Sequence, residues 1–243
     1  MSYKQLAAIA AASLLASIAN AGWNYGIGSG IASSNYDGDL KISSVLGTVD
    51  GDVEYDHDDF ESGFGAAAFA TDGTWVFNLS GSAVEYESKD TASGAPLRTT
   101  NNFERTFAEF SVGYVVYRED AITLTPYIGV NYTKHEWESK GVGFKGNLED
   151  DWTDAVFGLK LSYKINDEWT WNNSANYSAG DSEGCFGFKT GASWKFAEYW
   201  VIGAFIAYES DELDGSDSAL GTNVDFDYDT DVTTFGLTLA YVW

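Results

Sequence analysis

Apolar and polar residues alternate one by one along most of the chain. Between residues 154 and 164 every second residue is apolar, namely Ala155, Phe157, Leu159, Leu161 and Tyr163. The same rhythm recurs in 23–31, 108–116, 122–132, 169–177 and 186–196. A period of two predicts β-strands with one apolar face, and the chain body shows no helical repeat.

The composition of the two faces indicates where these strands lie. The second face consists mostly of Ser, Thr, Asn and Gly, and aromatic residues gather towards both ends of the apolar face. A transmembrane β-barrel has this arrangement, because its outside meets lipid, its inside is polar, and aromatic girdles mark the two membrane interfaces. We therefore expect an all-β fold, an antiparallel up-and-down barrel crossing the outer membrane.

The connections alternate in length, as expected for short periplasmic turns and longer outer loops. Ten strands are expected, with eight as the alternative because segment 60–70 is rich in Ala and Gly and ambiguous in phase. They lie near 22–33, 60–70, 74–87, 103–118, 121–138, 151–165, 168–179, 185–196, 199–209 and 231–243. The longer links are expected at 35–59, 88–102, 139–150, 180–184 and 210–229. An even number of strands places both termini on the periplasmic side.

The first 21 residues have the features of a secretory signal peptide. Lys4 precedes an apolar stretch, and Ala19-Asn20-Ala21 is a small-x-small cleavage site. We expect residues 1–21 to be removed and residues 22–243 to form the barrel. A formal charge of −24 argues against nucleic-acid binding. A single cysteine permits no intrachain disulfide.

The C-terminal strand carries a family resemblance. Its polar-x-Gly-x-x-apolar-x-aromatic pattern uses Gly236, Leu239 and Tyr241 and ends on Trp243. It resembles the terminal strand of small Gram-negative outer-membrane β-barrels of the OmpA, OmpX, OmpW or porin kind, although the usual terminal Phe is Trp here. The resemblance implies an outer-membrane location and recognition by the barrel-assembly machinery. We expect a monomer surrounded by outer-membrane lipid and lipopolysaccharide.

The two histidines do not match the catalytic motifs of outer-membrane enzymes. Omptin-type proteases have an Asp two residues before the catalytic His, whereas Tyr55 precedes His57 and Thr133 precedes His135. Palmitate-removing lipases of this class have a Ser two residues after the His, whereas Asp59 and Trp137 stand there. We therefore expect no enzymatic activity and no catalytic residues.

Acidic residues concentrate in two segments. Residues 35–61 and 209–231 each hold nine of the 37 Asp and Glu residues. These segments form either a solvated anionic surface or an irregular divalent-cation site, since hard cations prefer carboxylate oxygens. The candidate Ca²⁺ ligands are Asp50, Asp52, Asp225, Asp227, Asp229 and Asp231, and no other cofactor is expected.

The polar face of the strands predicts the lining of the lumen. The expected charged residues there are Arg105, Glu109, Asp154, Lys160, Lys164, Lys189 and Lys195. They form either the basic wall of a narrow pore or an internal salt-bridge network. A small barrel has an interior that side chains nearly fill. The leading function is thus a porin-like narrow channel for small solutes or ions, and the alternative is a surface anchor or adhesin acting through its acidic loops.

Overall fold

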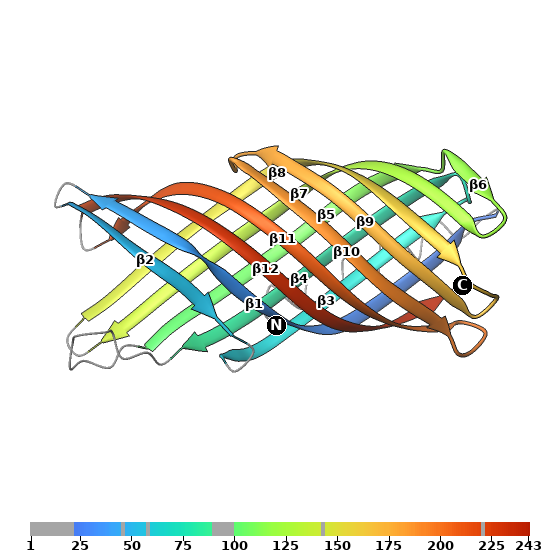
Figure 1. The fold of residues 1–243 in the computed structure, drawn as a ribbon, viewed down its shortest axis with the longest axis horizontal. Helices are drawn as coiled ribbons and strands as arrows, with labels where there is room; N and C mark the ends of the chain where they lie inside the picture. The colour runs from blue at the N-terminus through green and yellow to red at the C-terminus, as the bar shows by residue number, and fades with distance from the viewer. Residues whose placement is uncertain (1–21, 45–46, 57–58, 89–99, 142–143, 220–221) are drawn as a thin grey trace.

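The computed structural model is a closed antiparallel β-barrel (Figure 1). It describes residues 22–44, 47–56, 59–88, 100–141, 144–219 and 222–243, so the predicted signal peptide and His57 lie outside the described residues. The strands are β1 (Asn24–Ser44), β2 (Gly47–Tyr55), β3 (Phe60–Thr71), β4 (Trp75–Ser88), β5 (Thr100–Tyr114), β6 (Tyr117–Glu119), β7 (Ile122–Gly141), β8 (Phe144–Lys164), β9 (Trp169–Gly180), β10 (Gly184–Lys195), β11 (Trp200–Ala219) and β12 (Thr222–Val242).

Ten of these strands form the barrel wall, which confirms the predicted count. Each pairs with its neighbour in chain order, and β12 pairs with β1 to close the sheet. The remaining two are β2, which pairs with the outer part of β1, and β6, which pairs with the start of β7. The ambiguous segment 60–70 is a wall strand whose Phe64 is 55% exposed. No helix in the described part of the chain is long and apolar enough to cross a bilayer.

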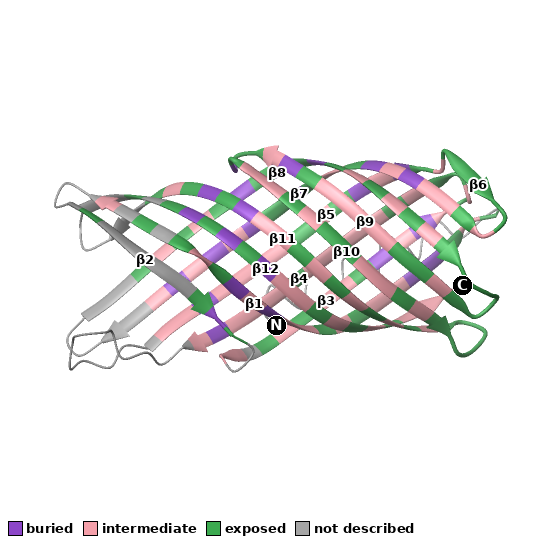
Figure 2. Cartoon of the chain, viewed as in Figure 1, coloured by how far each residue is buried: buried purple, intermediate pink, exposed green. Residues whose placement is uncertain are grey.

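The predicted inside and outside of the barrel are correct. Along β8, Ala155, Phe157, Leu159 and Leu161 are exposed, whereas the alternate positions are buried or half-buried. Figure 2 shows this alternation of exposed and less exposed residues along the strands. In water such an exterior would be a very large exposed apolar patch, so lipid has to cover it.

Aromatic side chains mark the periplasmic edge of the apolar band. Tyr241 packs against Trp200 and Trp243 with ring-centroid distances of 5.2 and 5.5 Å. Trp243 also exchanges two backbone hydrogen bonds with Tyr25, at 2.8 and 2.9 Å, next to the periplasmic end of the β1–β12 seam. Gly236 lies beneath the Phe205 ring, where a Cβ atom would collide with it. The predicted assembly-signal residues, Gly236, Leu239, Tyr241 and Trp243, therefore all belong to the closing strand or its end.

Three of the predicted long loops are instead extensions of strands. β1 and β2, β7 and β8, and β11 and β12 continue as ladders far beyond the outward apolar residues. The physical reason is that alternation persists there, but charged residues now replace apolar ones on the outward face. On β7, for example, outward Val130 and Tyr132 are followed by Lys134 and Glu136. We call this region the outer part of the barrel, and the region bearing the apolar exterior the membrane-spanning part.

The outer part divides into two groups of strands. β11, β12, β1 and β2 form one lobe, and β4, β5, β7 and β8 form the other (Figure 1). The division arises because the β9–β10 hairpin stops at Gly180 and Gly184, so that β8 and β11 continue outward without a strand between them. At the far left of Figure 1 the two lobes end apart from each other.

Candidate functional site

The lumen of the membrane-spanning part contains charged side chains packed against aromatic rings. Lys160 lies 4.7 Å from the centroid of the Tyr127 ring, and Lys189 lies 3.7 Å from that of Phe205. Glu109 also faces inward, opposite Asn131 on β7. Such cation–π contacts stabilise a desolvated ammonium group. Lys160 is half-buried and Lys189 is exposed, so both lysines lie beside aromatic rings at positions that water still reaches.

A cluster of charged side chains spans the lumen where the outer part of the barrel meets the membrane-spanning part. Arg105 on β5 contacts Glu209 at 2.7 Å and Asp211 at 3.5 Å, both on β11. Arg105 and Asp211 are well buried, with 13% and 7% of their side chains exposed. Burial raises the pKa of the Asp211 carboxyl to about 6, against the opposing effect of the Arg105 charge. Of the predicted lumen residues, Arg105 thus takes part in ion pairs between strands that are not neighbours, and its partners Glu209 and Asp211 were not predicted.

The other predicted lumen residues have structural or peripheral positions. Asp154 accepts hydrogen bonds from the backbone N–H and the hydroxyl of Ser182, at 3.0 and 2.9 Å, and so stabilises the β9–β10 turn. Lys164 and Lys195 point inward by register but are exposed at the periplasmic rim. Lys164 pairs there with Asp167 at 2.7 Å. These two lysines therefore do not line a passage.

Aromatic residues fill the lumen of the outer part, which the sequence analysis did not predict. The core comprises Tyr36, Tyr55, Tyr86, Phe103, Trp137, Trp152, Leu213, Tyr228 and Val232. Tyr86 and Phe103 have no exposed surface. The Tyr86 hydroxyl donates to the Ser34 carbonyl at 2.8 Å and accepts from the Ser34 N–H at 3.0 Å, which ties β4 to β1. A small pocket beside Arg105 has a volume of about 30 Å³, enough for about one water molecule.

His135 is buried within this aromatic core. Its ring makes edge contacts with Phe103, Trp137 and Trp152 at centroid distances of 5.2 to 5.3 Å, and it is 1% exposed. Among the described residues neither ring nitrogen has a hydrogen-bond partner. Burial, and then the nearby Arg105 charge, holds the pKa of His135 well below its usual value.

The outer part is expected to lose stability in acid because of His135. The unfolded state binds the proton below about pH 6.5 and the folded state does not, so stability falls as the pH drops below that value. Between pH 7 and 5 the loss relative to His135→Phe is at most about 2 kcal/mol, the value reached when folded His135 takes up no proton. Asp150 faces His135 across the β7–β8 ladder, and Arg105 faces it from β5.

Protonation of Asp211 in the same pH range stabilises the folded state and so opposes the effect of His135. Wild type and His135→Phe must therefore be compared with each other at each pH by equilibrium unfolding. A His57→Gln control should retain the acid loss; equal profiles for wild type and His135→Phe would contradict the assignment.

A hydrogen bond joins the two lobes at the gap between β8 and β11. The Trp152 indole N–H donates to the Asp214 carbonyl at 3.0 Å. The Trp152 ring is 2% exposed and belongs to the aromatic core. The aromatic core thus contains side chains from both lobes and holds the two lobes together.

Carboxylates cover the outward face of the first lobe. Asp225, Asp227, Asp229 and Asp231 are all exposed on β12, as their shared parity with the lipid-facing residues predicts. The further exposed carboxylates of this acidic outer face are Asp37, Asp39, Glu54, Glu212 and Asp214. The register places Asp52 next to Asp39 and Asp50 next to Lys41. Adjacent strands lie about 4.8 Å apart, so the neighbouring carboxylates of the acidic outer face repel one another.

The predicted cation site stays a prediction. The described residues contain no group of three or more His, Cys, Asp or Glu arranged to hold a metal ion. We expect millimolar Ca²⁺ to raise the thermal stability of the wild type by relieving carboxylate repulsion, and to do so much less when Asp225, Asp227, Asp229 and Asp231 are all Asn. Thermal unfolding with and without Ca²⁺ measures this, and equal stabilisation of both proteins would mean that the aspartates are simply solvated.

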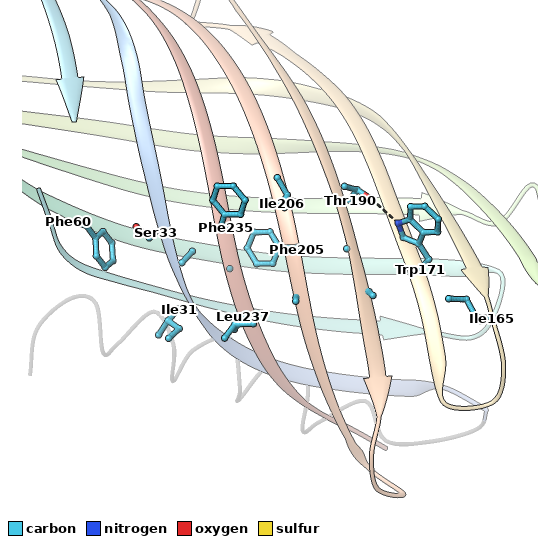
Figure 3. Close-up of a pocket in the computed structure, with 15 residues that line it drawn as sticks. Ile31, Ser33, Phe60, Ile165, Trp171, Thr190, Phe205, Ile206, Phe235 and Leu237 are labelled. Atoms are coloured by element: carbon cyan, nitrogen blue, oxygen red, sulfur yellow. Dashed lines mark hydrogen bonds between the residues drawn. The ribbon is translucent and has the colours of Figure 1, made fainter. Parts of the chain in front are cut away.

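A concave surface lies on the membrane-facing exterior. This groove of about 770 Å³ crosses β1, β12, β11, β10 and β9, and outward side chains such as Ile31, Ile206 and Leu237 line it (Figure 3). The Trp171 indole N–H donates to Thr190 at 2.8 Å at its edge. Since the groove belongs to the apolar band, we expect lipid chains to fill it.

Comparisons with known proteins support the fold. No protein-family model and no curated protein sequence matches the chain. The outer-membrane protease OmpT of Escherichia coli has a similar structure, with a TM-score of 0.61 at 11% identity, over 91% of this chain and 96% of that one. The toluene transporter TodX of Pseudomonas putida (TM-score 0.43, 10% identity, 93% and 90% covered) and Neisserial surface protein A (0.35, 12%, 91% and 97%) are more distant. The chain thus has the fold of outer-membrane β-barrels, and its predicted location in the bacterial outer membrane agrees with that fold.

Proposed function

We propose that this protein is a non-enzymatic, surface-exposed barrel that binds cationic ligands through the acidic outer face of its first lobe. The observation that carries the proposal is where the aromatic and the acidic side chains of the outer part lie. The lumen of the outer part is filled by an aromatic core, whereas the carboxylates lie on its outside.

The filled lumen favours a surface role over the narrow channel that the sequence predicts. A conducting path would have to pass Tyr86, Phe103 and His135, none of which is more than 1% exposed. It would also have to pass the Arg105 cluster, beside which a pocket of about 30 Å³ lies. A hydrated ion needs a continuous polar passage, and the buried aromatic side chains among the described residues argue against one.

The acidic outer face has the chemistry of a receptor for positive charge. Across the sheet, Glu212, Asp229, Asp39 and Asp52 stand side by side on four successive strands. Such a field attracts cationic polymers and peptides over about a Debye length and fixes their orientation. A monomer anchored in lipopolysaccharide-bearing lipid, after insertion by the barrel-assembly machinery, would present this face to the cell exterior.

Binding of a labelled penta-lysine peptide to the barrel in lipid vesicles tests the proposal. We expect saturable binding that weakens with salt. Replacing Asp225, Asp227, Asp229 and Asp231 by Asn should weaken binding about tenfold, since four exposed charge interactions of about 0.4 kcal/mol each are lost.

A matched control neutralises four carboxylates on the outward face of the second lobe. Glu104, Glu136, Glu138 and Glu149, all replaced by Gln, remove the same total charge from β5, β7 and β8. This variant should retain most of the binding. Equal losses in the two variants, or no binding by the wild type, would overturn the proposed function.

A further inference from the structure

Strand β2 forms the edge of the first lobe. Among the described residues it pairs with β1 alone, because β3 begins at Phe60 and β4 ends at Ser88. Glu87 of β4 donates its N–H to the Asp59 carbonyl at 2.9 Å, just after β2 ends. No described strand therefore continues along the other side of β2, and relative to the described strands its outer edge is a template for a further strand.

The backbone hydrogen bonds of β1 fix which residues of β2 point to this edge. Tyr25 and Trp243 exchange both backbone bonds, so the odd-numbered residues of β1 bond to β12. The β1–β12 register continues without a shift to Ser44, so the even-numbered residues of β1 bond to β2. Their partners on β2 are odd-numbered. The N–H and C=O groups of Thr48, Asp50, Asp52 and Glu54 therefore point away from β1, towards the edge.

The same register gives the two faces of β2 opposite chemistry. Asp50, Asp52 and Glu54 are at outward positions, level with Lys41, Asp39 and Asp37 of β1. Val49, Gly51, Val53 and Tyr55 are at inward positions, and Tyr55 belongs to the aromatic core. A strand added along β2 would thus meet carboxylates at every second residue and apolar positions at the others.

We infer that the edge of β2 binds an extended peptide in which cationic and apolar residues alternate, by adding it as a further strand to the first lobe. Backbone hydrogen bonds to Asp50 and Asp52 hold the peptide, and its Lys or Arg residues occupy the register positions level with these aspartates. Its apolar residues occupy the positions between them, level with Val49 and Val53. This inference rests on the proposed function and names the form of its ligand.

Two labelled peptides of equal composition separate strand addition from simple charge attraction. Both have the length of β2, nine residues, with five Lys and four Val. One alternates the two residue types, and the other has all Lys first and all Val last. The alternating peptide should bind the barrel in lipid vesicles about tenfold more tightly, because it alone matches both faces while it forms backbone bonds.

A proline substitution tests the edge itself. Asp52→Pro removes one edge N–H and spares the β1 ladder, because proline is tolerated where the N–H faces outward. Asp52→Asn removes the same charge and keeps the N–H. Asp52→Pro should weaken the alternating peptide about tenfold relative to Asp52→Asn, and the same pair at Asp50 provides a second test. Heat-modifiable gel mobility confirms that each variant is folded.

The outcomes distinguish this inference from the proposed function. Equal affinity of the wild type for the two peptides would overturn strand addition. Equal affinity of the Pro and Asn variants for the alternating peptide, at both sites, would overturn it as well. Either result is expected if another segment or a second copy of the chain covers the edge. The proposed function would survive such a result if penta-lysine binding still depends on the acidic outer face. Loss of all cationic binding in the wild type would overturn both.

Discussion

Replacing Arg105 by Met is expected to destabilise the barrel by about 3–5 kcal/mol, because it leaves buried Asp211 without its partner. Met retains most of the side-chain volume, so the effect comes from the lost charge rather than from a cavity. The cost should shrink between pH 7 and 5. Asp211 already has a pKa raised to about 6, and the folded variant takes up a proton there before the unfolded chain does.

Equilibrium unfolding in lipid vesicles measures this loss, and a double variant identifies its cause. Arg105→Met combined with Asp211→Asn should recover much of the stability, since no buried charge then lacks a partner. Glu209 is 36% exposed and is expected to contribute less. A loss below about 1 kcal/mol, the value of an exposed ion pair, would mean that water screens the cluster.

Arginine at Leu159 or Phe188 is expected to cost roughly 2–4 kcal/mol. Both side chains face outward in the apolar band, with 45% and 44% of their surface exposed. In lipid an arginine there loses its hydration, and the cost is largest near the bilayer midplane. Unfolding in vesicles of the same lipid for all variants provides the comparison.

Ser162 supplies the matched control on the same strand as Leu159. It faces the lumen and donates a hydrogen bond to Asn172 at 2.8 Å. Arginine at Ser162 reaches a polar interior open to the periplasmic end, and the effect should be far milder. Similar losses at Leu159 and Ser162 would mean that the two faces have been assigned the wrong way round.

The membrane-spanning part could be predicted from the sequence because lipid imposes a simple rule. Outward residues there are mostly apolar, so the parity of Leu159, Ile128 and Leu237 fixes the facing of whole strands. Facing follows from parity, which is why inward Arg105, Glu109 and Lys189 were identified. Parity alone gives no depth along the barrel, and the predicted lumen residues Lys164 and Lys195 are in fact exposed at the rim.

The sequence analysis predicted loops in the outer part because residues that face water, unlike those that face lipid, need not be apolar. Once the outward face is acidic, a strand such as 222–231 resembles a polar connection in composition, although Asp225 to Asp231 still alternate. The inward aromatics were a usable signal. Trp137 and Trp152 have the parity of the lumen-facing Thr133 and Asp154, opposite to the lipid-facing side chains. Aromatic residues of that parity indicate a filled lumen. The pairing of β12 with β1 and β2 depends on contacts remote in sequence and needed the structure.

Single-channel recording in planar bilayers tests the central claim most directly. The purified barrel, with insertion confirmed by its heat-modifiable mobility, should give no stepwise current at neutral pH on the proposed function, because Tyr86 and Phe103 are fully buried in the outer lumen and Arg105 pairs with Glu209 across it. A porin inserted into the same bilayer supplies the positive control. Reproducible conductance steps from the wild-type barrel would contradict a closed lumen and restore the narrow channel as its function.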